Sequence, residues 1–222
     1  MARIPGIPVR SRRAVKRALV GLGVVVLIAA MAANTRFMST DASVAVVGQK
    51  FSAEEYANEN YDAVVAAVVE RAKTPAELLD AFTADYEAAG NEFGGRDGSQ
   101  SAWAFPVSLA GAAGAVNEVN GQLTLTVEGI PETIAVLVQT GPPVIGPALR
   151  NVTGEIAFGM FTNQTEFQSV AVELNSKVRE NVLTGIDAAS LEGKTIAVVG
   201  VFAGDTWDSQ WLITPVQIEV VG

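Results

Sequence analysis

The 222-residue sequence contains no cysteine and no histidine. Without cysteine, disulfides, thiol nucleophiles and thiolate metal sites are excluded. Without histidine, serine–histidine triads and metal centres built on imidazole are excluded as well. We therefore expect neither a metal nor a cofactor. A chain of this length can bury enough apolar surface to fold without disulfides, so the lack of cysteine is compatible with an exported protein.

Basic residues are scarce outside the N-terminus. Six of the 15 lie within residues 1–34, which hold no acidic residue, so nine basic residues face all 24 acidic residues in the rest of the chain. Such an acidic body repels phosphate backbones, and we expect no binding to nucleic acid. Between Asp97 and Ser176 the only basic residue is Arg150, which makes it a candidate functional residue.

The N-terminal basic cluster directly precedes sixteen apolar residues, Ala18–Ala33. As a helix this run spans about 24 Å, slightly less than the roughly 30 Å hydrocarbon core of a bilayer, and Asn34–Met38 can extend it. The positive cluster predicts a cytoplasmic N-terminus, a single pass of the inner (plasma) membrane and an extracytoplasmic, periplasmic body. Ala30-Met31-Ala32 also matches a signal peptidase site. We favour a retained anchor, and a cleaved signal peptide is the alternative.

Two capping boxes predict helices after this segment. Ser52 with Glu55 begins one helix, and Thr74 with Glu77, followed by apolar residues at helical spacing and ended by Gly90, begins another. The short link between them predicts a helical hairpin, and Gly94–Ser101 is expected to be an exposed loop. The expected parts are therefore a basic tip and membrane or signal segment over 1–38, a helical hairpin and loop over 39–101, and a barrel domain over 102–222.

The apolar pattern changes to a period of two from Ala102 onward, which predicts strands. One long strand bent near Gly111–Gly114 is joined through the type I′ turn signal Asn120-Gly121 to a second strand. A buried strand over 132–139, a long helix over about 163–184 and two final strands complete the order. Pro215 places the last strand at an edge or at a bulge. The fold class is α+β, and the order matches an OB-like five-stranded antiparallel barrel with a long helix between strands 3 and 4. A generic α+β antiparallel sheet is the alternative.

Asp205 and Asp208 lie beside two tryptophans in "AGDTWDSQW", at an expected hairpin tip. Two carboxylates near aromatic rings are suited to a cation or a sugar, but Gly-Asp and Asp-Ser are also common turn sequences. No other spacing singles out a pair of acids for catalysis. A carboxylate-dependent hydrolase acting on envelope glycans is the enzymatic alternative that these residues leave open.

The stretch "VQTGPPVIGPALRN", followed by "IAFGMFTNQTEF", resembles the signature of an uncharacterised bacterial family of predicted periplasmic lipoproteins. Pro147 and Asn151 depart from the threonine and aspartate usual in that family, and the chain has no cysteine to carry a lipid. Members are often encoded beside sugar ABC transporters, so the resemblance implies an accessory role in the envelope. The most regular family positions are Gly141, Pro142, Ile145, Gly146, Ala148, Leu149, Arg150, Phe158, Phe161, Asn163 and Gln164.

The signature also predicts local roles for its residues. Gly141, Pro142 and Pro143 end the third strand and direct the chain away from the sheet, and Gly146 belongs to the same structural motif. We expect Phe158 and Phe161 to plug the mouth of the barrel.

Asn163 and Gln164 begin the long helix, where a side-chain oxygen satisfies free N–H groups. Two interpretations of Arg150 remain open. It pairs with Glu155 or caps a loop, or it converges with Asn151, Asn163 and Gln164 on a polar ligand or a partner surface.

Taken together, the sequence favours a non-catalytic, extracytoplasmic, membrane-tethered protein that assists a sugar ABC transport system. It would act through protein contact or by binding a small polar ligand. The hydrolase described above is the alternative.

Overall fold

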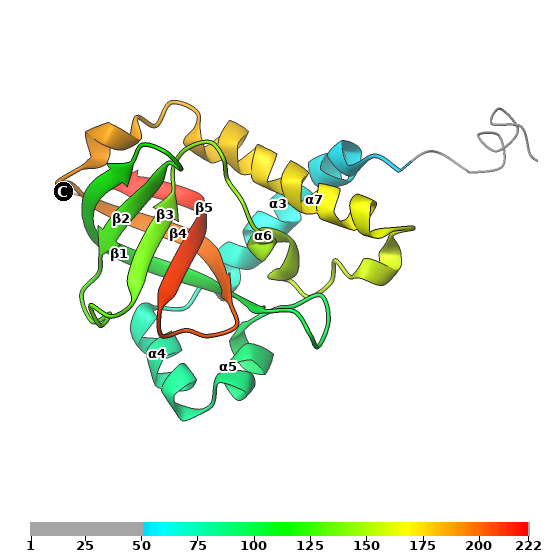
Figure 1. Ribbon diagram of the computed structural model, residues 1–222, viewed down its shortest axis with the longest axis horizontal. Helices are drawn as coiled ribbons and strands as arrows, with labels where there is room; N and C mark the ends of the chain where they lie inside the picture. The colour runs from blue at the N-terminus through cyan, green and yellow to red at the C-terminus, as the bar shows by residue number, and fades with distance from the viewer. Residues whose placement is uncertain (1–50, 222) are drawn as a thin grey trace, which may run out of the picture. The chain divides into compact units, whose positions relative to one another are not determined.

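The computed structural model describes residues 51–221, which belong to one compact unit (Figure 1). The predicted membrane or signal segment over 1–38, and the first residues of the 39–101 region, lie outside the described residues. Within residues 51–221, none of the helices combines enough length with enough apolar character to cross a bilayer.

A closed five-stranded barrel forms the centre of this unit, with the strand order β1-β2-β3-β5-β4 and β4 returning to β1. The prediction of a five-stranded barrel is confirmed, but the prediction that it is antiparallel is wrong, because β3 and β5 run parallel. The reason is geometric: an odd number of strands cannot alternate in direction all the way around a closed barrel. The strands are β1 (Trp103–Asn117), β2 (Gln122–Thr126), β3 (Ala135–Gln139), β4 (Thr195–Gly204) and β5 (Gln210–Val220).

The long strand β1 closes the barrel because its two halves pair with different neighbours. Residues 103–112 pair with β4, whereas residues 112–117 pair with β2, and the register shifts between Ala113 and Val116. The predicted bend near Gly111–Gly114 therefore exists within one continuous strand. A Cβ atom on Gly111 would lie 2.3 Å from the Thr126 carbonyl oxygen, so the bend depends on glycine at this close approach.

The predicted turn and bulge are also present, with one difference. The β1–β2 connection is a four-residue loop, 118–121, in which only Gly121 has a positive φ, so it is not the two-residue type I′ turn expected from Asn120-Gly121. Pro215 lies in β5 where the register with β4 shifts. Because a closed barrel has no edge, the bulge accommodates the missing N–H of this proline.

Helices cover the barrel on two sides (Figure 1). The second helix predicted from sequence is two helices, because Asp85 ends α4 and its side chain accepts a hydrogen bond from the Ala88 N–H to begin α5. Gly90 lies inside α5 rather than at a helix end. The helical segments are α3 (Ala53–Arg71), α4 (Pro75–Ala84), α5 (Tyr86–Phe93), α6 (Ala148–Asn151), η1 (Phe158–Met160), α7 (Gln164–Val178), a π-helical turn η2 (Arg179–Leu183) and η3 (Ala188–Leu191).

The predicted helical hairpin is not formed. Helix α3 packs against α7, which it crosses in Figure 1, whereas α4 packs on the barrel, and α3 and α4 belong to separate hydrophobic clusters. The cause lies in the link between them: the Lys73 N–H donates to the Pro106 carbonyl, and the Ser108 N–H donates to the Lys73 carbonyl. These bonds fix the link to β1, so the two helices leave in different directions.

Phe158 and Phe161 do not plug the barrel, which corrects that prediction. Phe161 is buried between α3 and α7, with its ring 5.6 Å from that of Phe167, and Phe158 is partly exposed beside the same ring. Instead, Phe82 of α4 packs on the aromatic residues of the barrel core, 4.7 Å from the Phe105 ring. The amphipathic face of α4 thus supplies the apolar cover of the barrel.

Candidate functional site

The segment that follows β3 is tied to the barrel by Gln139. This side chain is only 2% exposed. Its Nε2 donates to the Ile145 carbonyl (3.0 Å) and to Thr214 Oγ1 (2.9 Å), and its Oε1 accepts from the Ile145 N–H (2.8 Å). A buried amide with these bonds holds the irregular segment in one position relative to the sheet.

Gly141 and Gly146 shape the same segment. A Cβ on Gly141 would lie 2.9 Å from Gly121 Cα, so two chain segments approach each other through glycines. Gly146 has a φ of +97°, a conformation that favours glycine. Its carbonyl accepts a 2.9 Å hydrogen bond from Nδ2 of buried Asn175 in α7. The segment that begins at Gly141, where the chain was predicted to leave the sheet, is therefore shaped by the close approach at Gly141 and the backbone conformation of Gly146.

Arg150 on α6 is buried, with 6% of its surface exposed. Its Nε donates to Asn151 Oδ1 (2.9 Å), one terminal nitrogen donates to the Phe167 carbonyl (3.2 Å), and the other pairs with Asp97 Oδ2 (3.4 Å). The guanidinium also covers the Phe167 ring at 3.5 Å from its centroid. Burial lowers the pKa of Arg150 from its ordinary value, and the Asp97 charge partly opposes this shift.

The partner of Arg150 is therefore Asp97 and not Glu155, so that predicted ion pair is wrong. Asp97 comes from the Gly94–Ser101 loop, which was expected to be exposed, yet its side chain is only 10% exposed. Asn151 Nδ2 completes the network by donating to Asp97 Oδ1 (3.3 Å). The Arg150 side chain therefore bonds to the 94–101 loop, to α6 and to α7. These contacts are those expected from the interpretation in which Arg150 caps a loop.

Asn163 and Gln164 occupy the start of α7, as predicted. Asn163 Oδ1 accepts from the Glu166 N–H (2.9 Å), and Asn163 is the N-cap residue. Gln164 is exposed and lines a cavity together with Arg150, whereas Asn151 and Asn163 do not line it. A binding role for these four residues stays a prediction.

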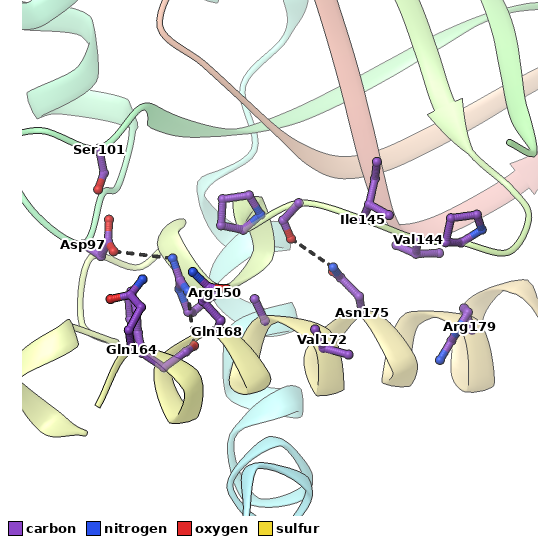
Figure 2. Close-up of a pocket in the computed structure, with 15 residues that line it drawn as sticks. Asp97, Ser101, Val144, Ile145, Arg150, Gln164, Gln168, Val172, Asn175 and Arg179 are labelled. Atoms are coloured by element: carbon purple, nitrogen blue, oxygen red, sulfur yellow. Dashed lines mark hydrogen bonds and ion pairs between the residues drawn. The ribbon is translucent and has the colours of Figure 1, made fainter. Parts of the chain in front are cut away.

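This cavity is an open groove of about 680 Å³ between α7 and the segment 143–150, referred to below as the α7 groove. Figure 2 shows Asp97, Arg150, Gln164 and Gln168 at one end, Ile145 and Val172 in the middle, and Arg179 at the other end. The volume lies within the range of small-molecule sites. The lining residues are Asp97, Ser101, Pro143, Val144, Ile145, Gly146, Pro147, Arg150, Gln164, Phe167, Gln168, Ala171, Val172, Asn175 and Arg179.

Sequence reasoning missed Asp97, Gln168, Val172 and Arg179 as parts of this site. Helical spacing carried one usable signal, because four residues recur at intervals of four and seven along a stripe beside the buried face: Gln164, Gln168, Val172 and Arg179. Asp97 carried no such signal, since 53 residues separate it from Arg150.

Asp205 and Asp208 lie on the connection between β4 and β5, and both are exposed. The neighbouring Trp207 stacks on Phe82 at 6.0 Å, so this aromatic ring serves packing. Within residues 51–221, no three Asp or Glu side chains gather closely enough to hold a metal ion.

Comparison with known proteins agrees with the fold and gives the family. The chain is similar to a crystal structure of an OB-fold protein from Thermotoga maritima, at 17% identity and a TM-score of 0.62, over 78% of this chain and 100% of that one. At this identity the likeness concerns the fold alone. No curated protein matches the sequence. The family described as "Predicted periplasmic lipoprotein (DUF2291)" matches residues 24–219, and the chain therefore belongs to this family.

Proposed function

We propose that this protein is a non-catalytic, extracytoplasmic accessory of a sugar ABC uptake system, tethered to the membrane by its N-terminal apolar segment. The α7 groove is its binding surface for a small polar ligand or a protein partner. The observation that carries this proposal is the groove itself, a cavity of about 680 Å³ with exposed polar groups on a buried, hydrogen-bonded frame. Membership of a predicted periplasmic family supports the extracytoplasmic location.

The frame supports a binding role because it fixes the groove before anything binds. Gln139 ties one wall to the barrel, Asn175 ties that wall to α7, and Arg150 ties α6 to both α7 and the Asp97 loop. A preformed site loses little conformational entropy on binding, which favours affinity.

Within the groove the residues divide into two roles. Arg150 and the Nδ2 group of Asn175 donate to protein atoms and so support the walls, whereas the buried Oδ1 of Asn175 has no protein partner in the described part of the chain. Gln164, Gln168 and Arg179 are exposed and can face an occupant. OB-folds commonly bind ligands through loops and sheet faces, so a binding role suits the fold, although here the groove lies on the crossover between β3 and β4.

Site-specific photocrosslinking of the full chain in its native membranes tests the proposal. A photoreactive residue replaces Val172 in the groove or, as a matched control, Val119, an exposed valine on the β1–β2 loop. We expect a component of a sugar transporter to be captured from position 172 and not from position 119. Thermal unfolding of the same protein in the presence of a panel of sugars tests whether it binds a sugar. Capture of no transporter component, together with no stabilisation by any sugar, would contradict the proposed function.

A further inference from the structure

The occupant of the α7 groove can be narrowed from the chemistry of its lining, on the assumption that the groove is the binding surface proposed above. Two apolar side chains on opposite walls are unusually open: Ile145 is 49% exposed and Val172 is 60% exposed. Figure 2 shows both in the middle of the groove. Exposed apolar groups that line the same cavity favour an occupant with an apolar body.

Charge distinguishes the two ends of the groove. At one end Arg150 is neutralised by Asp97, but at the other end Arg179 is exposed and, among the described residues, contacts no carboxylate. The guanidinium of Arg179 donates a hydrogen bond to Ser176 Oγ. The groove thus has a local excess of one positive charge on a strongly acidic body, and this charge favours an anionic group beside Arg179.

The lining is poorly suited to a sugar. Phe167 is the aromatic residue of the lining, and the Arg150 guanidinium already covers its ring at 3.5 Å. Among the residues that the structure describes in the groove, no other aromatic ring is present for a sugar ring to stack on. The buried side-chain donors of the lining, on Arg150 and Asn175, are bonded to protein atoms, whereas the buried Asn175 Oδ1 accepts no hydrogen bond from residues 51–221.

An extended peptide is also poorly matched, because it needs hydrogen-bond partners for its backbone. The wall facing α7 contains Pro143 and Pro147, which have no N–H. Both backbone groups of Ile145 are bonded to Gln139, and the Gly146 carbonyl is bonded to Asn175. A bound peptide would leave much of its backbone without partners on this wall.

We infer that the α7 groove binds a small acyl carboxylate, with its carboxylate on Arg179 and its apolar chain against the part of the lining that contains Val172 and Ile145. From Arg179 to Gln168 the groove follows eleven residues of helix, about 16 Å at the helical rise. An extended eight-carbon chain has seven C–C bonds of about 1.5 Å and spans less than about 11 Å, so it fits within this length. Longer chains reach the amides of Gln164 and Gln168.

The test uses the full chain and an octanoate that carries a diazirine, with the crosslinked peptide located by mass spectrometry. We expect adducts on α7 that octanoate competes away. Each added methylene from hexanoate to octanoate should lower the competing concentration about fourfold. Octan-1-ol, which lacks the charge, should compete about tenfold less well or worse.

Two variants that each add one negative charge, one inside the groove and one far from it, provide a matched control. Val172→Asp places a negative charge in the groove, and Val119→Asp places one on the remote β1–β2 loop; both residues are exposed, so neither change disturbs the core. The α7 adducts should be lost in V172D and kept in V119D. In R179Q, octanoate should compete no better than octan-1-ol.

Adducts that persist in both V172D and R179Q, or that occur only in the N-terminal apolar segment, would overturn the inference. Competition by a sugar without competition by octanoate would also overturn it, and would leave the proposed function standing. Capture of a transporter component from position 172 is measured separately, so the two ideas fail independently.

Discussion

Arg150 provides the sharpest test of how the site is built. Replacing it with methionine keeps an unbranched side chain but removes the charge, so Asp97 is left as a nearly buried carboxylate without its cation. Asn151 Oδ1 and the Phe167 carbonyl lose their donor at the same time. Breaking a buried ion pair by removing one partner costs about 3–5 kcal/mol. For a chain of this length, that lowers Tm by about 6–20 °C.

A double-mutant cycle separates the pair from the rest of the side chain. Asp97→Asn removes the stranded charge, so the double variant R150M/D97N should be about 2 kcal/mol more stable than the sum of the two single changes predicts. Lys177→Met is the control, because Lys177 pairs with Glu180 on the surface and such pairs contribute about 0–1 kcal/mol. The assay is thermal unfolding of the purified variants. If R150M unfolds no earlier than K177M, or if the cycle shows no coupling, Arg150 is not the clamp that the contacts indicate.

Three further predictions concern other parts of the molecule. Gly90→Ala should destabilise the protein by about 1–3 kcal/mol in thermal unfolding despite better helix propensity, because the new Cβ would lie 2.3 Å from the Trp103 ring; an unchanged Tm would refute this. Burial raises the pKa of Tyr86 to about 12, helped by nearby carboxylates. The stability that this neutral phenol contributes is present below pH 10 and lost as pH rises through 12. Absorbance titration should show a last tyrosine step that Y86F abolishes, and an unchanged titration would refute the assignment. Asn163→Ala removes the α7 cap and should cost about 1 kcal/mol while leaving octanoate competition intact; lost competition would place Asn163 in the binding site instead.

Local sequence signals predicted the elements that depend on neighbouring residues. Capping boxes placed the starts of α3 and α4, and asparagine at position 163 placed the start of α7. Alternating apolar residues predicted one long bent strand for β1, and Pro215 predicted a bulge. These features depend on hydrogen bonds and side-chain periods within a few residues, which a sequence displays directly.

Features that depend on distant contacts were predicted less well. The pairing of Arg150 with Asp97 joins residues 53 apart, and nothing near Asp97 indicates that its loop turns inward. The hairpin prediction failed because Lys73 bonds to β1, a strand more than thirty residues away. Phe158 and Phe161 were assigned to the wrong core, because apolar character alone does not say which of two hydrophobic clusters a residue joins.

The location of the folded body is the claim on which the proposed role depends most. Because the chain has no cysteine, single cysteines can be introduced at Ser11, in the basic tip, and at Val119, which is 92% exposed. The measurement is labelling of each variant in intact spheroplasts with a membrane-impermeant maleimide. We predict that V119C is labelled before lysis and that S11C is labelled only after it. Labelling of V119C only after lysis would place the body in the cytoplasm and contradict the account.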